Sequence, residues 1–475
     1  MNIDSSKPQL LKDLASLSAR LPPMYEVGGA VRDRLLGRET CDIDVAAHDP
    51  EKAARLMEHT LGTKTVAFNR ESRATACYRI LSLNDPGIHL DLVHIQGESI
   101  ERDLARRDFT INAMARTLGA ERDTEIIDPF GGREDLKQGI IRATRPENIA
   151  QDPLRIMRAF RLSAQLNFCI EPRTREVIRE NSGLVLKSAP ERIKSELGIM
   201  LGFPRACDRL GQMEEMGVLE ALFPEIDPMR GCTQNAFHHL DVLRHSFQAC
   251  ASCEEIIAEP EKTFPGHGQE INAVLAGGYR LPWLKLAALM HDMGKPCCRK
   301  RRGRSGRITF YGHEKTGAGM AEDIAQRLKF SRREREYLKL LVREHMHIFA
   351  LSGAEVKKST LMRFLRRVGE DLIPIVILGL ADSRATQGEK RPQEESEGFE
   401  VWAREVIRDY FRDFKTEMEQ KPLLTGRDLL NLGLTPGPRI GKILREARLA
   451  QDDGIITDRN QALAWAREYI GKPSG

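Results

Sequence analysis

Two carboxylates one residue apart are the clearest chemical feature of this sequence. In the run CDIDVAA, Asp42 and Asp44 alternate with apolar residues. Side chains alternate between the two faces of a β-strand, so this pattern predicts a strand that carries both acids on one face. Because neighbouring carboxylates repel each other, a shared divalent cation explains them best. Their oxygen ligands suit Mg²⁺ that is also held by substrate phosphates.

A glycine pair that precedes these acids is a candidate phosphate site. Residues 25–27 are expected to form a short strand that runs into Gly28 and Gly29, and the following AVRDRLLG has the pattern of a helix start. Glycines let the chain approach phosphate oxygens closely, a helix N-terminus offers partial positive charge, and Arg32 adds a forked donor. The pattern therefore predicts a triphosphate site, with an ordinary strand-to-helix turn as the alternative.

Other charged residues near this region have two interpretations each. Asp91, within GIHLDLVHI, is either a third metal ligand or a solvent-facing carboxylate at the end of a strand. Arg106 and Arg107, within RDLARRDFTINAMA, either clamp the triphosphate or form a solvated basic helix end. Thr110 and Asn112 are candidate caps of an expected apolar helix that follows.

A helix that reads a nucleobase is expected in QDPLRIMRAFRL. Pro153 suits its first turn, and Asp152, Arg155, Arg158 and Arg161 follow at three-residue steps, which places them on one side of the helix. An aspartate accepts from the exocyclic amino group of cytosine or adenine, which uracil lacks, while an arginine donates to the ring acceptors beside it. This chemistry would select C and A over U. An ion-paired surface helix is the alternative.

Histidines and aspartates of a second candidate site are spread over helical segments further along. His291 and Asp292 are adjacent, His245 precedes them and Asp382 follows them. This order resembles the HD phosphohydrolase superfamily, whose metal is held by one His, a His-Asp pair and a distal Asp. The resemblance implies that these four residues are metal ligands.

Two more histidines, His313 and His345, are candidates for a second metal or for phosphate contact. Imidazole nitrogens mixed with carboxylates suit a transition metal, and Mn, Ni, Zn and Fe all fit. An intact ligand set implies hydrolysis of a phosphoester, such as a 2′,3′-cyclic phosphate or a 2′-phosphate, by a water that the metal activates. A site retained only for folding is the alternative.

The elements that must position these residues divide the chain into two kinds of structure. A chain of 475 residues, 41% apolar and 30% charged, should form several domains, since one hydrophobic core stops growing at roughly 250 to 300 residues. From about residue 25 to 145, β-rich and helical runs alternate, which indicates α/β structure. From Asp152 onward the pattern is almost entirely helical. The net charge of +4 permits a nucleic-acid partner without requiring one.

Three further segments have their own expectations. The polar run near residues 386 to 398 is expected to be a flexible connection. The basic run from Arg299 to Arg307 precedes ITFYGHE, which has the pattern of a strand. The run favours a projecting hairpin that touches RNA phosphates, and a solvated loop is the alternative. No secretory signal and no apolar stretch of the ~20 residues that a membrane span needs are evident, so we expect a cytoplasmic protein with no membrane partner.

The nine cysteines form no regular disulfide framework, so most are expected to be small buried thiols. The spacing of Cys250 and Cys253, together with Cys297 and Cys298, leaves a structural zinc site as a less favoured alternative.

Several motifs together resemble one family. GGAVRD, DID, RRDFTINAMA, DPFGGREDL and QDPLRIMRAFR occur in the order seen in bacterial tRNA nucleotidyltransferases and the related poly(A) polymerases, the class II family. The likeness continues through ERIKSEL, LFPEID and LLTGRDLLNLGLTPGPRIGKIL, so it covers nearly the whole chain. It implies an α+β nucleotidyltransferase head, a small mixed sheet with helices, followed by a mostly α-helical neck, HD body and tail.

The expected domains are a head or palm at residues 1–145, a helical neck with the base-selecting helix at 146–235, an HD phosphohydrolase domain at 236–385 and a helical tRNA-binding tail at 399–475.

The resemblance also implies a reaction and a role for each matching residue. The chain would add nucleotides from CTP and ATP to the 3′ end of tRNA without a nucleic-acid template, by two-metal nucleotidyl transfer. The implied nucleotide-binding residues are Gly28, Gly29, Arg32, Arg107, Asp152, Arg155, Arg158 and Arg161, and the implied catalytic Mg²⁺ ligands are Asp42 and Asp44.

Two departures from the family pattern bear on specificity. Gln151 stands where the family usually has Glu, next to the base-reading Asp152. The segment between Asp91 and Arg106 is short, whereas CCA-adding members have a longer flexible loop there and members without it tend to stop after CC. This favours a CC-adding enzyme. The alternatives are a poly(A) polymerase and a protein whose principal activity is the HD phosphohydrolase. Asp42 and Asp44 argue against the second of these, and they exclude an RNA-binding scaffold, because clustered unpaired carboxylates are costly without a metal.

Overall fold

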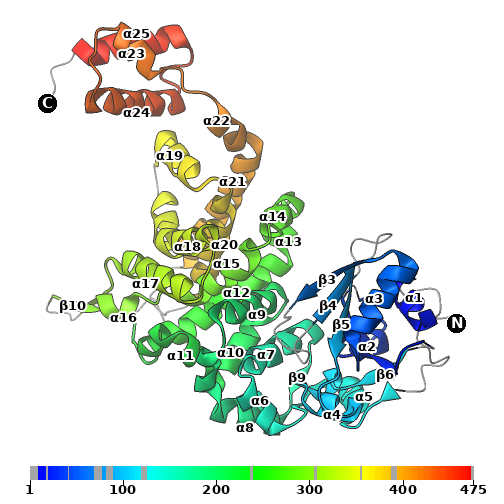
Figure 1. The fold of residues 1–475 in the computed structure, drawn as a ribbon. Coiled ribbons are helices and arrows are strands. Elements are labelled where there is room, and N and C mark those ends of the chain that lie inside the picture. The colour runs from blue at the N-terminus through cyan, green and yellow to red at the C-terminus, as the bar shows by residue number, and fades with distance from the viewer. Residues whose placement is uncertain are drawn as a thin grey trace. The chain divides into compact units, whose positions relative to one another are not determined.

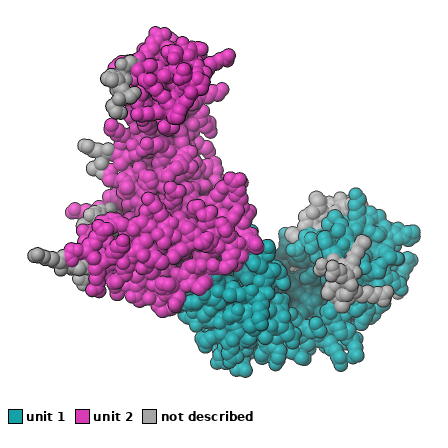
Figure 2. All heavy atoms as spheres, turned by 60° about the vertical axis from the view of Figure 1, so that its left-hand side comes forward, with its two compact units in different colours: residues 1–200, 212–222 teal, residues 201–211, 223–475 magenta. Residues whose placement is uncertain are grey.

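The computed structural model describes residues 9–17, 20–40, 42–68, 77–81, 89–118, 126–235, 239–303, 307–353, 356–386 and 393–471 (Figure 1). The chain forms two compact units (Figure 2). Residues 1–200 and 212–222 make the first unit, and residues 201–211 and 223–475 make the second. No helix within the described ranges is both long enough and apolar enough to cross a membrane.

A seven-stranded mixed sheet forms the centre of the described part of the first unit. Its strand order is β3-β4-β5-β2-β1-β6-β7. The strands are β1 (Met24–Val27), β2 (Asp42–Ala47), β3 (Lys64–Phe68), β4 (Cys77–Leu81), β5 (His89–His94), β6 (Ala115–Thr117) and β7 (Ile126–Ile127). Strand β2 pairs antiparallel with β1 and parallel with β5, so Asp44 lies opposite Val27 on one side and Asp91 on the other.

The helices of this sheet domain are α1 (Gln9–Leu17), α2 (Gly29–Leu35), α3 (Pro50–Leu61), α4 (Ile100–Ala105) and α5 (Gly132–Gln138). The two faces of β2 differ. Ile43 and Val45 are buried in a cluster with apolar residues of α1 and α3. The other face carries Ala46, which packs with residues of α4, while Asp42 is exposed and Asp44 is half-buried. The predicted strand with both acids on one face is confirmed.

A helical segment continues the first unit. It contains β8 (Ile140–Ile141), α6 (Pro146–Gln151), α7 (Leu154–Leu166), β9 (Cys169–Ile170), α8 (Pro172–Glu180), most of α9 (Pro190–Gly202), the end of α10 (Ala206–Glu215) and α11 (Val218–Leu222). Residues 201–211, with the first part of α10, belong to the second unit. β8 and β9 pair in parallel. Along α7 the apolar residues are buried, whereas Arg155, Arg158 and Arg161 are half-buried. The three arginines therefore share the more open side of the helix, as their spacing predicts.

The second unit is mostly helical. Its helices are α12 (Val242–Ala258), α13 (Pro260–Thr263), α14 (Gly268–Leu275), α15 (Arg280–Met290), α16 (Lys295–Cys298), α17 (His313–Arg327), α18 (Arg332–Leu351), α19 (Lys358–Val368), α20 (Leu372–Ala385), α21 (Gln393–Asp409), α22 (Lys415–Glu419), α23 (Gly426–Asn431), α24 (Pro438–Asp452) and α25 (Arg459–Gly471). Helix α12 packs on α15 and α20, and α18 packs on α17 and α20. A smaller apolar cluster holds α23, α24 and α25 together.

Shorter turns complete the described chain. There are 3-10 turns at Thr110–Asn112, Ser182–Lys187, Pro224–Met229 and Gly369–Asp371, and a π-helical turn at Tyr410–Phe414. The basic run forms the expected hairpin, because β10 (Lys300–Arg302) pairs antiparallel with β11 (Arg307–Thr309). The strand ends at Thr309, and the rest of ITFYGHE leads into α17.

Three sequence expectations about local structure are wrong. The apolar run after Asp108 is a 3-10 turn followed by β6, and the Asn112 side chain bonds other side chains and caps no helix. The polar run is not flexible throughout, because α21 begins at Gln393; residues 387–392 lie outside the described residues. Cys250 forms a disulfide with Cys207, so it cannot serve as a zinc ligand.

The remaining described cysteines are free and only partly fit the expectation of buried thiols. Cys253 is buried, whereas Cys169 and Cys297 are exposed. No cysteine belongs to a group of residues that could hold a metal ion in the described part of the chain.

Candidate functional site

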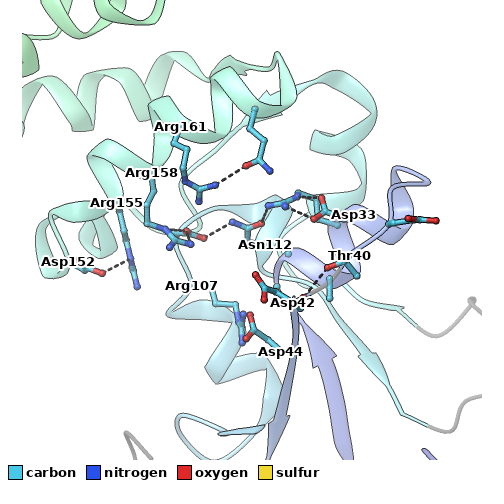
Figure 3. Close-up of a pocket in the computed structure, with 17 residues that line it drawn as sticks. Asp33, Thr40, Asp42, Asp44, Arg107, Asn112, Asp152, Arg155, Arg158 and Arg161 are labelled. Atoms are coloured by element: carbon cyan, nitrogen blue, oxygen red, sulfur yellow. Dashed lines mark hydrogen bonds and ion pairs between the residues drawn. The ribbon is translucent and has the colours of Figure 1, made fainter. Parts of the chain in front are cut away.

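One cavity of the first unit collects the residues that the sequence singles out. It has a volume of about 640 Å³ and lies where β1 and β2 meet α2 and α7 (Figure 3). All ten predicted nucleotide-binding and catalytic residues line it: Gly28, Gly29, Arg32, Asp42, Asp44, Arg107, Asp152, Arg155, Arg158 and Arg161. Its other lining residues include Asp33, Glu39, Thr40, Asp108, Asn112 and Gln165.

The two aspartates of β2 provide the negative end of this cavity. Burial raises the pKa of Asp44, and the carboxylates of Asp91 and Asp42 raise it further, while the positive charges of Arg107 and Arg158 oppose the rise. Asp42 is exposed and also pairs with His89 of β5. Two hard oxygen donors that share a face and repel each other fit a divalent cation such as Mg²⁺.

Asp91 is not among the residues that line the cavity. Its two carboxylate oxygens accept from Nε and Nη2 of Arg79, at 2.8 and 2.7 Å. The reading of Asp91 as a third ligand therefore gains no support, although its charge acts on Asp44 from the neighbouring strand.

A close approach of three groups requires glycine at position 28. Gly28 has φ of +72°, in the left-handed region that favours glycine. A Cβ atom there would lie 2.9 Å from Arg107 Nη1 and 3.7 Å from Asp44 Oδ2. Arg107 is held in turn by the Asp103 carboxylate, which accepts from Nε and Nη2 at 3.1 and 3.0 Å. The Nη1 edge of Arg107 is thereby fixed beside the glycine turn and the acids.

A chain of hydrogen bonds joins the glycine turn to α7. Arg32 donates to both carboxylate oxygens of Asp33, at 2.8 and 2.9 Å, and to Asn112 Oδ1 at 2.8 Å. Asn112 Nδ2 donates to Asp108 Oδ1 at 3.1 Å, and Arg158 Nε donates to Asp108 Oδ2 at 2.7 Å. One hydrogen-bond network therefore positions Arg32 and Arg158, which come from distant parts of the sequence.

Asp108 is the centre of this network and was overlooked in the sequence, where Asn112 was taken for a cap. Burial raises the pKa of Asp108, but the charge of Arg158 and hydrogen bonds from Asn112 and the Phe109 amide outweigh burial, so the pKa is lowered. The four-residue spacing of the aspartate and the asparagine was the available signal. This spacing indicates a network only once the structure shows Asn112 bonded to Arg32 and Asp108 bonded to Arg158.

The side chains of α7 are held to different degrees. Arg155 donates to the carbonyl oxygens of Arg106 and Asn148, at 2.6 and 3.1 Å. The Asp152 carboxylate lies 4.0 Å from Arg155 Nε, which is too far for a hydrogen bond. Figure 3 shows both side chains along the cavity wall. Arg155 is thus anchored to backbone, while Asp152 Oδ2 lies 4.0 Å from both Arg155 Nε and Arg192 Nη2 and makes only long ion pairs with them.

Arg161 stands further along α7. Its Nε donates to Glu196 at 2.5 Å and its Nη1 donates to Gln165 at 2.8 Å. Arg161, like Arg155, is therefore held by two protein groups.

The expected clamp of Arg106 with Arg107 does not form. Arg106 lines a separate cavity of about 520 Å³ together with Arg102, Arg145 and Gln151. Gln151, the residue that departs from the family pattern, thus stands outside the main cavity, on α6.

A second cluster lies in the other unit and joins six buried residues. His245 comes from α12, His291 and Asp292 follow α15, His313 begins α17, His345 lies on α18 and Asp382 lies on α20. They form two groups that could each hold a metal ion, one of His245, His291 and Asp382 and one of Asp292, His313 and His345. The four predicted HD ligands and both additional histidines are therefore brought together.

Asp292 connects the two groups. Its Oδ2 lies 3.2 Å from His291 Nε2 and 3.5 Å from His245 Nε2. Its Oδ1 lies 3.2 Å from His313 Nε2 and 3.7 Å from His345 Nε2. One carboxylate thus faces both groups with different oxygens, which is the arrangement of a bridging ligand.

The histidine rings are oriented by backbone carbonyls. Nδ1 of His291, His313 and His345 lies 2.8, 2.8 and 2.7 Å from the carbonyl oxygen three residues earlier. Donation from Nδ1 leaves Nε2 as the ligand atom that faces the cluster, as in metal-binding histidines generally. The mixed imidazole and carboxylate donors fit a transition metal.

The charges of this cluster are strongly coupled. Burial lowers the pKa of His291, but the carboxylates of Asp292 and Asp382 outweigh it and raise the pKa to about 10. Burial likewise raises the pKa of Asp292, but His291 and Lys295 hold it well below its usual range. Buried carboxylates in this position make added positive charge favourable, which fits a cation site.

Three family models match the chain. The Poly A polymerase head domain matches residues 24–142, the probable RNA and SrmB-binding site of polymerase A matches residues 167–230, and the HD domain matches residues 269–387.

Full-length relatives and a solved structure agree with these matches. An A-adding tRNA nucleotidyltransferase of Deinococcus radiodurans is 31% identical, over 94% of this chain and 96% of the relative. A CC-adding tRNA nucleotidyltransferase of Thermus thermophilus is 33% identical, over 94% of each chain. The structure of a Thermotoga maritima CCA-adding enzyme complexed with tRNA has a TM-score of 0.64 at 20% identity, and the match covers 98% of this chain and 97% of that one. The structural likeness shows the common fold.

The Asp108 network predicts a pH-dependent loss of stability. Asp108→Asn should lower the free energy of unfolding by about 2 kcal/mol at pH 7, because it breaks the ion pair between the buried Asp108 carboxylate and the half-buried Arg158. The folded pKa is depressed, so the stabilisation is fully present above the unfolded pKa of 3.8 and is lost as the pH falls through the folded pKa. Urea unfolding between pH 7 and pH 3 should show that the stability difference between the wild type and Asp108→Asn shrinks only below pH 3.8.

Asp208→Asn, which removes an exposed ion pair with Arg205, is the control and should change the free energy of unfolding by less than about 1 kcal/mol. An equal effect of both variants would contradict the prediction.

Proposed function

The chain belongs to the tRNA nucleotidyltransferase family, and on this premise we propose that it adds C residues to the 3′ end of tRNA from CTP and stops after CC. The observation that supports the proposal most directly is that one cavity contains both a carboxylate pair suited to Mg²⁺ and an Asp-Arg pair suited to a nucleobase. Neither pair alone would distinguish nucleotide addition from nucleotide hydrolysis.

In this proposal the base is chosen by protein groups on α7. Asp152 accepts from the exocyclic amino group of cytosine, and Arg155 donates to the ring acceptors beside it. The two backbone carbonyls that hold Arg155 keep this donor in a fixed position. Because Arg155 donates and Asp152 accepts, a base must present the complementary pattern of hydrogen-bonding groups. Uracil does not present it.

The phosphates are held by the turn between β1 and α2. The Gly28-Gly29 turn lets the backbone approach the phosphate oxygens closely, and Arg32 and Arg107 add positive charge from two sides. Arg158 supports the base-reading end through Asp108, so the network links it to Arg32 at the phosphate end. A nucleotide that spans the cavity is therefore oriented at both ends before transfer.

Asp42 and Asp44 would hold Mg²⁺, which when bound lowers the pKa of the primer 3′-hydroxyl and neutralises charge on the leaving pyrophosphate.

Addition of CC alone is favoured by the segment between Asp91 and Arg106. It consists of the end of β5, a turn and α4, all of them described. The family resemblance associates full CCA addition with a longer flexible loop at this place. Because relatives of this chain include both an A-adding and a CC-adding enzyme, a single terminal A is the closest competing product.

The HD cluster supports a second activity, hydrolysis of a phosphoester at a tRNA end. His245, His291, Asp292 and Asp382 would hold a transition metal such as Mn, Ni, Zn or Fe, with His313 and His345 beside a second one. Such a metal supplies Lewis acidity toward a phosphate and a water. The nearby Lys295, whose Nζ lies 2.5 Å from Asp292 Oδ2, adds positive charge beside the site.

Product length tests the principal activity. The full chain is incubated with tRNA transcripts that lack CCA or only its final A, with CTP and ATP separately and together. We expect CTP-dependent addition of two residues to the first transcript and no extension of the second. Asp42→Ala should reduce extension at least about 100-fold, a loss of about 3 kcal/mol of transition-state stabilisation.

Asp323→Ala, an exposed aspartate of α17, is the matched control and should keep full activity. A single added A, a complete CCA end or a long A tail would each contradict CC addition, and extension by Asp42→Ala would remove the proposed metal site.

Base selection tests the Asp-Arg pair separately. Asp152→Ala should lower the ratio of kcat/KM for CTP over UTP by about 10-fold or more, because one good bidentate base contact is worth about 1–3 kcal/mol. Glu191→Ala, an exposed acid at the start of α9, should leave the ratio unchanged. An unchanged ratio in Asp152→Ala would show that the base is chosen elsewhere.

Metal removal and replacement test the HD activity. Wild-type protein should hydrolyse a 2′,3′-cyclic phosphate at an RNA end when Mn, Ni, Zn or Fe is supplied, and a chelator should stop it. Asp292→Asn should lower both the bound metal content and the hydrolysis at least about 10-fold, while tRNA extension persists, because Asp292 faces both metal groups. Absence of hydrolysis in the wild type with every one of these metals would refute the second activity.

A further inference from the structure

A cavity of about 500 Å³ opens beside the HD cluster, in the second unit. Its lining includes His313 and Asp382 of the cluster, so a phosphate held there would reach the metal-binding residues. A phosphate group alone does not need this space, since pockets of roughly 300 to 1,000 Å³ bind whole small molecules. The cavity therefore has room for the group that carries the phosphate.

The lining of this cavity combines positively charged and apolar side chains, and Lys295 Nζ lies 5.6 Å from the centre of the Phe310 ring. Lys295 and Arg307 bring positive charge to the cavity, and Lys295 Nζ is also bound by Gln234 Oε1 at 2.7 Å. The apolar lining comes from β11, the turn that follows it and the end of α18, and comprises Ile308, Phe310, Tyr311, Met346 and Phe349. A ligand that matches both the positive and the apolar side chains has an anionic part and a flat or apolar part.

Tyr311 and Met346 are unusually open for large apolar side chains. Tyr311 is 72% exposed and Met346 is 40% exposed. Single exposed residues of this kind are common, but these two line the same cavity next to a candidate phosphate site. A ligand that covers both would remove this apolar surface from water.

The aromatic groups are held in place by neighbours. The guanidinium of Arg302, on β10, lies over the Tyr311 ring at 5.1 Å from its centre. Phe349 is backed by Phe399, with ring centres 4.5 Å apart. A supported aromatic ring with an arginine on the same hairpin is a common platform for an unpaired nucleobase. The hairpin lies next to α16 and α17 (Figure 1).

We propose that this cavity binds the base and ribose of a terminal nucleotide whose phosphate lies against the HD cluster, with Tyr311 as the stacking platform and Met346 and Phe349 as the apolar wall. The inference rests on the proposed phosphohydrolase function and names its substrate class, an unpaired RNA end. Stacking accepts every base, because each has a flat face, so this site differs from the base-selective head.

Binding to the full-length protein supplied with Mn²⁺ tests this directly. The probes are uridine 3′-monophosphate and ribose 5-phosphate, and uridine is chosen because the head is expected to reject it. Stacking of one base is worth about 1–3 kcal/mol, so the nucleotide should bind at least about 5-fold more tightly than the sugar phosphate in calorimetric titrations. Tyr311→Ala should abolish this preference, whereas Tyr311→Phe should retain it. Both variants should extend tRNA as the wild type does, which verifies folding.

A hydrolysis assay distinguishes failure of the proposed nucleotide-binding cavity from failure of the proposed phosphohydrolase activity. With metal present, Tyr311→Ala should raise KM for uridine 2′,3′-cyclic phosphate at least about 5-fold, with a smaller effect on kcat. Equal binding of the two probes, unaffected by Tyr311→Ala, would overturn the inference even if hydrolysis is normal. Tyr311-dependent nucleotide binding without hydrolysis under any metal would sustain the inference as a binding site and refute the phosphohydrolase.

Discussion

Burial of two apolar side chains in β2 is the constraint on which the head depends. Ile43 and Val45 are completely enclosed with residues of α1 and α3, so the acids between them must face the other side of the sheet. A shift of this strand by one residue would exchange the two faces and bury the acids. The core therefore fixes the direction of the carboxylates before any cation or nucleotide is present.

Asp108 extends this constraint from the sheet to the helices. Its carboxylate accepts from Asn112 on one side and from Arg158 on the other, and Asn112 also binds Arg32. A buried charge is stable only when it is well paired, so the network resists displacement of any single member. The parts of the cavity to which we assign phosphate binding and base reading consequently form one unit, which suits the proposed orientation of a whole nucleotide.

The HD cluster follows the same principle with a different central group. Asp292 offers one oxygen to each of two histidine groups, and the rings of His291, His313 and His345 are oriented by the backbone carbonyl three residues earlier. The cavity beside it adds a part that the cluster does not supply, an aromatic wall at Tyr311. In both sites, polar residues that do chemistry are held by partners that take no part in it.

The sequence by itself determined the strand with Asp42 and Asp44, the side of α7 that carries the arginines, and ten of the seventeen residues that line the head cavity. These follow from residue periods of two and 3.6 and from motifs in a fixed order, which are local properties. Only the tertiary structure decided that Arg106 turns to another cavity, that Arg79 binds Asp91, that Cys250 joins Cys207, and that Asp108 and Asn112 link Arg32 to Arg158. Each of these contacts depends on which side chains from distant segments lie close together in space. The local pattern of a sequence does not contain that information.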